Sequence, residues 1–567
     1  MLDLDKIDEL IDEEIDGVKL SKICIELSIW RYLTVAEDFT RISYICEDCN
    51  FENIFFINYK MKFVYKFAIQ KICREMLNIQ TIKVNNKTDS KSYKEYSNLI
   101  GVCVGYVGKY NMLSNLYEKS IFLNEKIDNN YSYEYNRYEY LCEYSALELL
   151  SHGKSIRDIF ITIILSLYSV RKDTQFKSVV FEAYRERVTL RKRKVTYDFF
   201  DFDIYNFESL FGNLSREGIF ECDFNYKWGG TDFTRDVINS ILFRCLFHIV
   251  MIWVAMRKYN FTGGFEDCLV LKINKNILIE NIKFISGFEN TDSITEILNF
   301  LVYPVEDMNA DSALQPIFLF NDNFYLPCFH ILESNMERNI ISLYARKEKK
   351  RFDKESKVFE YHMVESIEKN IINKYKYEKN FKIRILKKDQ EYDFIIIDQE
   401  NKVILIVELR WMIQPADPRE ISRRISACRE KVDKVKEKKK FFLNGIDFFE
   451  ERLDIKGLDE YELHGLIVLD GYGGEYSGNE SIPITTLEVF NLSLANCKNL
   501  RLVYQSLKSL EWLPQENIFF ESDRMNLDLN EYSFSIPGLR MIDRDTDKYV
   551  KYLNDFFRNY ELEENYA

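Results

Sequence analysis

Two acidic residues and an arginine are spaced so that they could act together on a phosphate ester. Asp393 is followed by fourteen residues and then by Glu408, and Arg410 comes two residues later. Two carboxylates that face each other repel, unless the pKa of one of them rises or a divalent cation binds between them. Such a cation stabilises the charge on a phosphodiester under attack, and a guanidinium can support it. The spacing therefore favours metal-dependent hydrolysis of phosphodiester bonds.

A β-hairpin is the element that would bring the two carboxylates together. Residues 392–397 and 402–407 are almost unbroken apolar runs, separated by the polar residues 398–401. They predict two central strands that are apolar on both faces. With a two-residue loop or a symmetric four-residue loop, the numbers of paired residues sum to 801, so Asp393 stands opposite Glu408. Directly opposed residues share one face of a sheet, and Arg410 falls on that face by strand alternation.

One helix is predicted before this hairpin in the sequence, and a second helix after it. Residues 358–373 carry Glu360 at the start of an apolar stripe with a helical repeat. Residues 419–440 carry a second apolar stripe, and they hold ten Lys or Arg against four acids, a net charge of 10 − 4 = +6. A helix of this kind could follow a phosphate backbone. Two later apolar runs, residues 463–469 and 482–490, predict further strands.

This order of elements, together with the string Asp393, fourteen residues, Glu408-Leu409-Arg410, resembles the PD-(D/E)XK, or restriction-endonuclease-like, nuclease superfamily. The resemblance implies a nuclease that uses Mg²⁺ or Mn²⁺, with DNA as the favoured substrate. It implies metal ligation by Asp393, Glu408 and the carbonyl of Leu409. It further implies that Arg410 stabilises the phosphate charge and that Glu360 is the third carboxylate of the catalytic set. A recognition region joined to such a domain resembles prokaryotic defence or restriction enzymes.

One position departs from the family pattern. The family normally has Lys where this chain has Arg410. Arginine stays charged and can bind a phosphate through two hydrogen bonds, but it cannot act as a neutral base. The family also tolerates displaced lysines, and Lys431, Lys434, Lys387 and Lys388 are all candidates for that role. For the third carboxylate, Glu365 and Glu368 on the same helix are alternatives to Glu360.

The charge distribution supports a nucleic-acid partner for this part of the chain. With 77 basic and 91 acidic residues, the net charge of −14 excludes a protein that coats nucleic acid with its whole surface. Residues 346–440 hold 27 basic and 18 acidic residues, or +9, which leaves −23 for the remainder. The expected nucleic-acid contacts lie on the basic helix and are Arg419, Arg423, Arg424, Lys431 and Lys434.

A length of 567 residues predicts three to four domains, at about 150 residues each. The fold class expected is a multi-domain protein with a mainly α N-terminal region, a small α+β module and an α/β restriction-endonuclease-like domain whose central mixed sheet is flanked by helices. The expected ranges are 1–262 for the helical region, 263–345 for the small module, 346–498 for the nuclease-like domain and 499–567 for a C-terminal helical extension. Within the small module, residues 269–279 and 317–326 are predicted to form hairpins.

A cytoplasmic location is expected. The first residues are acidic where a secretory signal would be basic, and twelve scattered cysteines are typical of reduced thiols. The most apolar stretch, residues 237–256, contains Asn239, Arg244 and His248, which favours a buried helix over a membrane span. No membrane association is predicted.

Three other interpretations remain open from the sequence. The chain could be an inactive nuclease-fold protein that binds nucleic acid or assembles with other components. The helical region could be the functional centre, sensing a partner protein or activator, with the C-terminal domain as its effector. At the site itself, Arg410 could simply neutralise Glu408 in a structural ion cluster without a metal.

Overall fold

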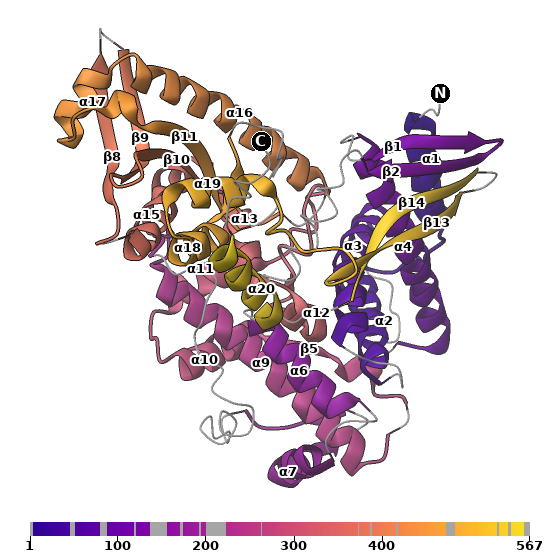
Figure 1. Cartoon of the computed structure of the whole chain (residues 1–567). Helices are drawn as coiled ribbons and strands as arrows, with labels where there is room; N and C mark the ends of the chain where they lie inside the picture. Colours follow the sequence, from indigo (N-terminus) through magenta and orange to yellow (C-terminus); the bar gives the residue numbers. More distant parts are fainter. Residues whose placement is uncertain are drawn as a thin grey trace. The chain divides into compact units, whose positions relative to one another are not determined.

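The chain is multi-domain, and its described residues form many helices and several β-sheets, two of which combine parallel and antiparallel strands (Figure 1). The computed structural model describes residues 4–45, 51–79, 88–117, 121–135, 156–169, 174–191, 194–199, 223–261, 263–371, 373–385, 388–415, 418–471, 482–529, 532–542 and 546–560. The chain divides into two compact units. Unit 1 comprises residues 1–110 and 153–352, and unit 2 comprises residues 111–152 and 353–567.

Unit 1 is built mainly from helices. Its helices are α1 (Leu4–Asp16), α2 (Ile25–Ile45), α3 (Phe51–Met76), most of α4 (Ser90–Tyr117), α6 (Ile156–Tyr168), α7 (Thr174–Tyr184), α9 (Thr231–Lys258), α10 (Lys275–Ser286), α11 (Thr291–Leu301), α12 (Cys328–Glu333) and α13 (Met336–Lys347), and α14 (Lys349–Glu355) spans the boundary with unit 2. Its strands are β3 (Thr189–Arg191), β4 (Lys194–Thr196), β5 (Val270–Asn274), β6 (Phe318–Phe320) and β7 (Asn323–Pro327).

Helix α9 contains the apolar stretch for which a buried helix was predicted. It is the one helix among the described residues that is long and apolar enough to cross a membrane, and 94% of its most apolar window is buried. Two of its polar side chains have partners inside the unit. Arg244 donates to Asn281 at 2.9 Å, and the His248 ring lies 2.8 Å from the Cys268 carbonyl. The prediction of a buried helix is confirmed.

The two predicted hairpins of the small module have different outcomes. The hairpin over residues 269–279 is wrong, because β5 runs directly into α10. The Asn274 side chain accepts a hydrogen bond from the Asn276 amide and caps that helix, so a polar cluster that reads as a turn is a helix start. The second hairpin is confirmed as β6 and β7, with Asn321 and Asp322 at positive φ in the turn.

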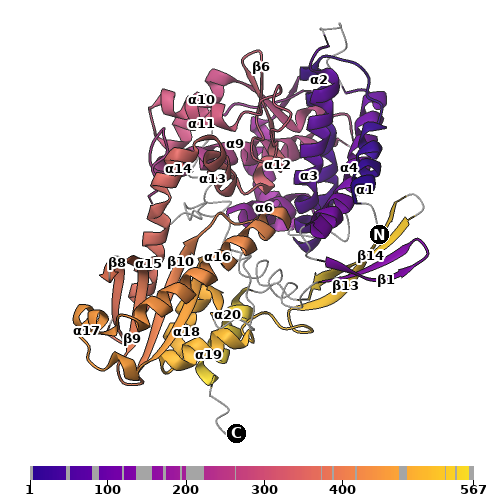
Figure 2. The same cartoon turned by 90° about the horizontal axis from the view of Figure 1, so that it is seen from above.

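The main sheet of unit 2 has the strand order β12-β11-β10-β9-β8. Its strands are β8 (Lys376–Ile385), β9 (Lys388–Asp398), β10 (Val403–Trp411), β11 (Glu462–Asp470) and β12 (Ile484–Thr486). Strands β8, β9 and β10 are antiparallel neighbours, whereas β11 and β12 run parallel to β10. Helix α16 (Pro418–Leu443) packs on one face of the sheet, and α15 (Lys357–Ile371) and α19 (Leu500–Ser509) pack on the other (Figures 1 and 2).

The register of the central hairpin is the one predicted. The pairs run from Val403 opposite Asp398 to Val407 opposite Phe394, and each pair sums to 801. Consecutive residues such as Ile395 and Ile396 point to opposite faces of the sheet, and both are fully buried. The strands are therefore apolar on both faces. Hydrophobic clusters on the two sides of the sheet hold this pair of strands in place.

A second sheet in unit 2 has the order β1-β2-β14-β13. It joins β1 (Ile121–Ile127) and β2 (Asn130–Tyr135) to β13 (Phe520–Leu529) and β14 (Tyr532–Met541). Residues 121–135 are therefore a hairpin inside the region predicted to be helical. Likewise, the predicted helical extension contains the β13–β14 hairpin beside α19 and α20 (Thr546–Asn559).

The strand predicted over residues 482–490 is mostly wrong. Only Ile484–Thr486 form β12, and α18 (Leu487–Asn496) begins at once. The Thr486 side chain accepts a hydrogen bond from the Val489 amide and caps this helix. A short apolar run does not distinguish a buried strand from a buried helix by its periodicity. The described residues of this unit also form α17 (Ile446–Leu453).

Candidate functional site

Asp393 and Glu408 lie side by side where β9 and β10 meet. The last pair of the ladder is Val407 and Phe394. Glu408 comes after Val407 in β10 and Asp393 comes before Phe394 in β9, so the two acids occupy the next position in the same register. The Leu409 amide donates a hydrogen bond of 3.0 Å to Asp393 Oδ2, which ties the Asp393 carboxylate to the neighbouring strand. Glu408 is almost fully buried, whereas the Asp393 side chain is 28% exposed. The pair is therefore open to solvent on the Asp393 side.

Two lysines of α16 hold the Glu408 carboxylate between them. Lys431 Nζ donates to Glu408 Oε1, and Lys438 Nζ donates to Glu408 Oε2. Lys438 Nζ also lies 3.9 Å from Asp393 Oδ1. We call Lys431 and Lys438 the lysine clamp. Because both oxygens of Glu408 accept from the clamp, the repulsion expected between the two carboxylates is compensated by cations of this chain.

The pKa values of the two carboxylates shift in opposite directions. Burial raises the pKa of Asp393 to about 6, and the charge of Glu408 adds to the rise, although Lys438 and the Leu409 amide oppose it. Burial alone would also raise the pKa of Glu408. For that residue, however, Lys438 and Lys431 outweigh burial and hold the pKa below its ordinary value. Near neutral pH Glu408 is a carboxylate, and Asp393 is the first of the two to take up a proton on acidification.

Arg410 contacts Glu360 rather than Glu408. Its Nη1 lies 3.9 Å from Glu360 Oε1, and the two side chains are 42% and 43% exposed. The interpretation in which Arg410 neutralises Glu408 is wrong, because the lysine clamp does so. Arg410 Nε is buried without a hydrogen-bond partner in the described part of the chain. An anion at the strand end could accept from this nitrogen.

Helix α15 reaches the site through an aromatic contact. Trp411 stacks on Phe359 with ring centroids 4.0 Å apart, so it packs the end of β10 against α15. This contact sets the start of α15, and hence Glu360, beside the end of β10. The alternative carboxylate Glu368 accepts from Tyr377 at 2.6 Å and from Lys379, both on β8. Glu368 therefore serves the contact between α15 and β8.

The residues predicted to contact nucleic acid fall into two groups on α16. Arg419, Arg423 and Lys434 are exposed. Arg424 is buried, and its guanidinium donates to the Asp470 carbonyl at 2.6 Å, which fastens α16 to the end of β11. Lys431 is held by Glu408. Three of the five side chains are thus exposed at the surface of the unit.

Of the candidates for a displaced lysine, only Lys431 is in contact with the carboxylate pair. Lys388 is the first residue of β9, five residues before Asp393, and pairs with Ile385. Lys387 lies outside the described residues. Lys438 was missed, although it is seven residues after Lys431 and three after the buried Val435. That spacing places it on the same helical face as the apolar stripe, and a lysine on such a stripe signals a buried anionic partner.

The chemistry of the donor set decides whether a divalent cation fits this site. Among the residues that the structure describes, no group of three or more His, Cys, Asp or Glu side chains is placed to hold a metal ion. The predicted set consists of two carboxylates and the Leu409 carbonyl, which are oxygen ligands of the kind Mg²⁺ prefers, with waters completing the shell. The set fits a divalent cation once the clamp gives up an oxygen of Glu408.

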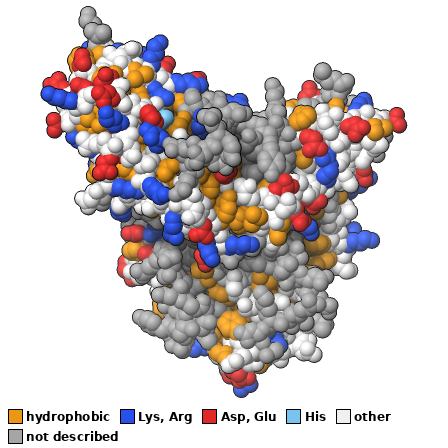
Figure 3. Space-filling view, viewed as in Figure 1, with side chains coloured by type: hydrophobic (Ala, Val, Ile, Leu, Met, Phe, Trp, Pro, Cys, Tyr) orange, Lys and Arg blue, Asp and Glu red, His pale blue; other side chains and the backbone are white. Residues whose placement is uncertain are grey.

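The surface of unit 2 around β8 and α17 mixes both signs of charge (Figure 3). In the β8–β9 hairpin, Lys382 pairs with Glu391 at 3.2 Å, and Arg384 lies 3.5 Å from Asp389. The cations of this hairpin are matched by acids on the adjacent strand. The exposed face of α16 is therefore the better candidate for a nucleic-acid contact.

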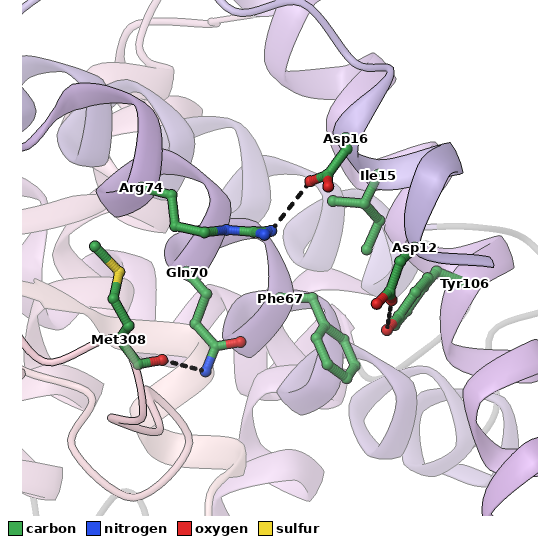
Figure 4. Close-up of a pocket in the computed structure, with 8 residues that line it drawn as sticks. All are labelled: Asp12, Ile15, Asp16, Phe67, Gln70, Arg74, Tyr106 and Met308. Atoms are coloured by element: carbon green, nitrogen blue, oxygen red, sulfur yellow. Dashed lines mark hydrogen bonds and ion pairs between the residues drawn. The ribbon is translucent and has the colours of Figure 1, made fainter. Parts of the chain in front are cut away.

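A pocket in unit 1, with a volume of about 240 Å³, lies between α1, α3, α4 and the loop at Met308 (Figure 4). Its polar side chains pair with their neighbours. Tyr106 donates to Asp12 at 2.8 Å, Arg74 lies 3.3 Å from Asp16, and Gln70 donates to the Met308 carbonyl at 3.3 Å. These pairs account for the polar lining, and the pocket brings no reactive group together.

Comparison with protein-family models, with curated proteins and with solved structures found no match.

Proposed function

We propose that unit 2 is a metal-dependent nuclease that hydrolyses phosphodiester bonds, with DNA as the favoured substrate. The observation that carries the proposal is the pair of adjoining carboxylates Asp393 and Glu408, set beneath a helix with exposed basic residues. The mixed sheet with an antiparallel β8-β9-β10 edge and parallel β11 and β12 supports a restriction-endonuclease-like fold. We assign the protein to the cytoplasm of a prokaryote, in a defence or restriction role, with unit 1 as the receiver of a partner protein or activator.

Each residue of the site has a role in this proposal. Asp393, Glu408 and the Leu409 carbonyl hold Mg²⁺ or Mn²⁺, which when bound activates water and stabilises the charge on the phosphate. Arg410 donates to the phosphate through the exposed end of its guanidinium. Glu360 orients Arg410. The clamp lysines supply the positive charge that the family's motif lysine would provide, and Arg419, Arg423 and Lys434 contact the backbone of the nucleic acid.

Cleavage assays test the proposal. Supercoiled plasmid, single-stranded DNA and RNA are incubated with Mg²⁺, Mn²⁺ or EDTA. We expect cutting by the wild type that requires the metal and falls by at least about 100-fold in Glu408→Ala, since a metal ligand is lost. Glu451→Ala, which removes an exposed glutamate of α17 that is not a candidate for the site, is the matched control and keeps its activity. Cutting that survives in Glu408→Ala would contradict the proposal.

A second candidate function is an inactive nuclease-fold protein that binds nucleic acid. The observation in its favour is that both oxygens of Glu408 already accept from lysines, while Arg410 replaces the motif lysine. This protein would bind DNA with an affinity that falls with salt and does not respond to metal. If the wild type does not cut but Arg410→Lys does, the second candidate is favoured.

A further inference from the structure

The lysine clamp occupies the oxygens that a metal ion would need. Glu408 is almost fully buried, so a cation can reach its carboxylate only if one of the two ammonium groups leaves. With the clamp closed, a divalent cation would also meet two positive charges at close range. The closed clamp therefore opposes metal binding.

The two clamp lysines differ in how firmly they are held. The Lys438 side chain is 7% exposed, lies close to both carboxylates and has its ammonium 5.7 Å from the centre of the Tyr392 ring. Lys431 is 16% exposed, and in the described part of the chain its ammonium group pairs with Glu408 only. It also lies on the same helix as the exposed Arg423 and Lys434. Lys431 is the member of the clamp that solvent, or a ligand along α16, can reach.

We propose that Lys431 exchanges Glu408 for a backbone phosphate of the nucleic acid, and that this exchange frees an oxygen of Glu408 for the divalent cation. Lys438 stays in place and keeps the carboxylate pair together. Nucleic acid and metal then bind with positive coupling, and each raises the affinity for the other by the same factor. This inference rests on the proposed function, and it adds that the site takes up its metal efficiently only when substrate is bound.

The coupling is measured as metal affinity, without reference to cleavage. The full chain is titrated with Mn²⁺, and the shift of its unfolding temperature gives an apparent dissociation constant. Each titration is made with and without a short DNA duplex whose phosphorothioate linkages resist hydrolysis. The variants are Lys431→Met, Asp393→Asn to define binding at this site, and Lys440→Met, which removes an exposed lysine of α16 outside the clamp.

For the wild type we expect DNA to tighten Mn²⁺ binding by about tenfold or more. Lys431→Met should bind Mn²⁺ about tenfold more tightly than the wild type without DNA, and should gain little when DNA is added. Lys440→Met should behave like the wild type. The two charge deletions are equal, so a difference between them reports the clamp contact.

Two results would overturn the inference in distinguishable ways. If DNA leaves the Mn²⁺ affinity of the wild type unchanged, or Lys431→Met binds Mn²⁺ no more tightly than Lys440→Met, the coupling is wrong. The metal site would still stand, provided that Asp393→Asn abolishes binding. If no Mn²⁺ binding depends on Asp393 in the wild type or in Lys431→Met, with or without DNA, the proposed function fails together with the coupling.

Discussion

Glu408 illustrates how the chain keeps a carboxylate inside a strand pair. A buried charge costs several kcal/mol unless it is paired and hydrogen-bonded. Here two ammonium groups from α16 pair with Glu408, and the Leu409 amide donates a hydrogen bond to Asp393. The position of both acids could be predicted from the sequence, because strand alternation and a symmetric loop fix which residues oppose each other. Lys438 could not be found from the motif, because its approach depends on how α16 packs on the sheet.

A second buried carboxylate, Glu37 in unit 1, predicts a pH-dependent stability. Burial raises the pKa of Glu37 to about 7, although hydrogen bonds from the Phe329 and His330 amides and from Tyr65 lower it. Between the unfolded value of 4.5 and about 7, the folded chain binds a proton that the unfolded chain does not. The contribution of Glu37 to the free energy of unfolding therefore falls as the pH rises through this window, by up to about 3 kcal/mol, and does not change further above it.

Urea unfolding of the full chain at pH 5 and pH 8 measures this effect. We expect the difference in unfolding free energy between the two pH values to shrink in Glu37→Gln, since an amide does not titrate there. Comparison of the differences cancels the other titrating groups. An equal pH difference in the wild type and the variant would show that Glu37 titrates at its ordinary value.

At the scale of elements, the packing of α16 on β11 governs the site. Gly465 of β11 lies beneath this helix, and a Cβ at that position would come within 2.3 Å of the Val435 side chain. Val435 sits between the two clamp lysines on α16. A glycine here allows the close approach of helix and strand that brings Lys431 and Lys438 to Glu408.

Gly465→Ala should therefore destabilise unit 2 by about 1 to 3 kcal/mol, because the added methyl group overpacks the interface. The matched control is Gly538→Ala on β14, where a Cβ would meet no atom closer than 3.8 Å. Thermal or urea unfolding of the two variants provides the comparison. Equal stabilities would mean that α16 adapts to the methyl group without cost.

Long helices and strands could be predicted from the sequence, whereas the starts of two helices could not. The β9–β10 hairpin and α16 could be predicted, because long apolar runs and a helical stripe fix their type. The start of α10 at Lys275 and of α18 at Leu487 could not, because each depends on a single capping side chain, Asn274 or Thr486. The polar cluster around Asn274 is also typical of a turn, and the apolar run around Thr486 is also typical of a strand. Neither pattern indicates that the residue caps a helix.

At the scale of the whole molecule, the two units should respond differently to metal. We expect Mn²⁺ with DNA to slow amide hydrogen exchange in β9, β10 and α16, since a ligand stabilises the segments that bind it. Peptides from α2 and α12 of unit 1 should exchange at unchanged rates. Hydrogen exchange with mass spectrometry makes the measurement, and Asp393→Asn should remove the effect. Uniform protection of both units would contradict a metal site confined to unit 2.

The composition of unit 2 could not be predicted from local patterns. Residues 111–152 belong to it although they precede most of unit 1 in the sequence. The pairing of Ser533 with Asn130 and of Ser535 with Ser132 joins β14 to β2, and such long-range pairing leaves no mark in either segment alone.

That pairing also determines when the second sheet of unit 2 can form during synthesis of the chain. Strand β2 ends at Tyr135, and its partner β14 begins only at Tyr532. At roughly 5 to 20 residues per second, the early hairpin leaves the ribosome tens of seconds before the strand that completes its sheet. During this interval one edge of the hairpin offers unpaired amides and carbonyls to any neighbouring nascent chain. Unit 2 thus closes only after β14 has been synthesised.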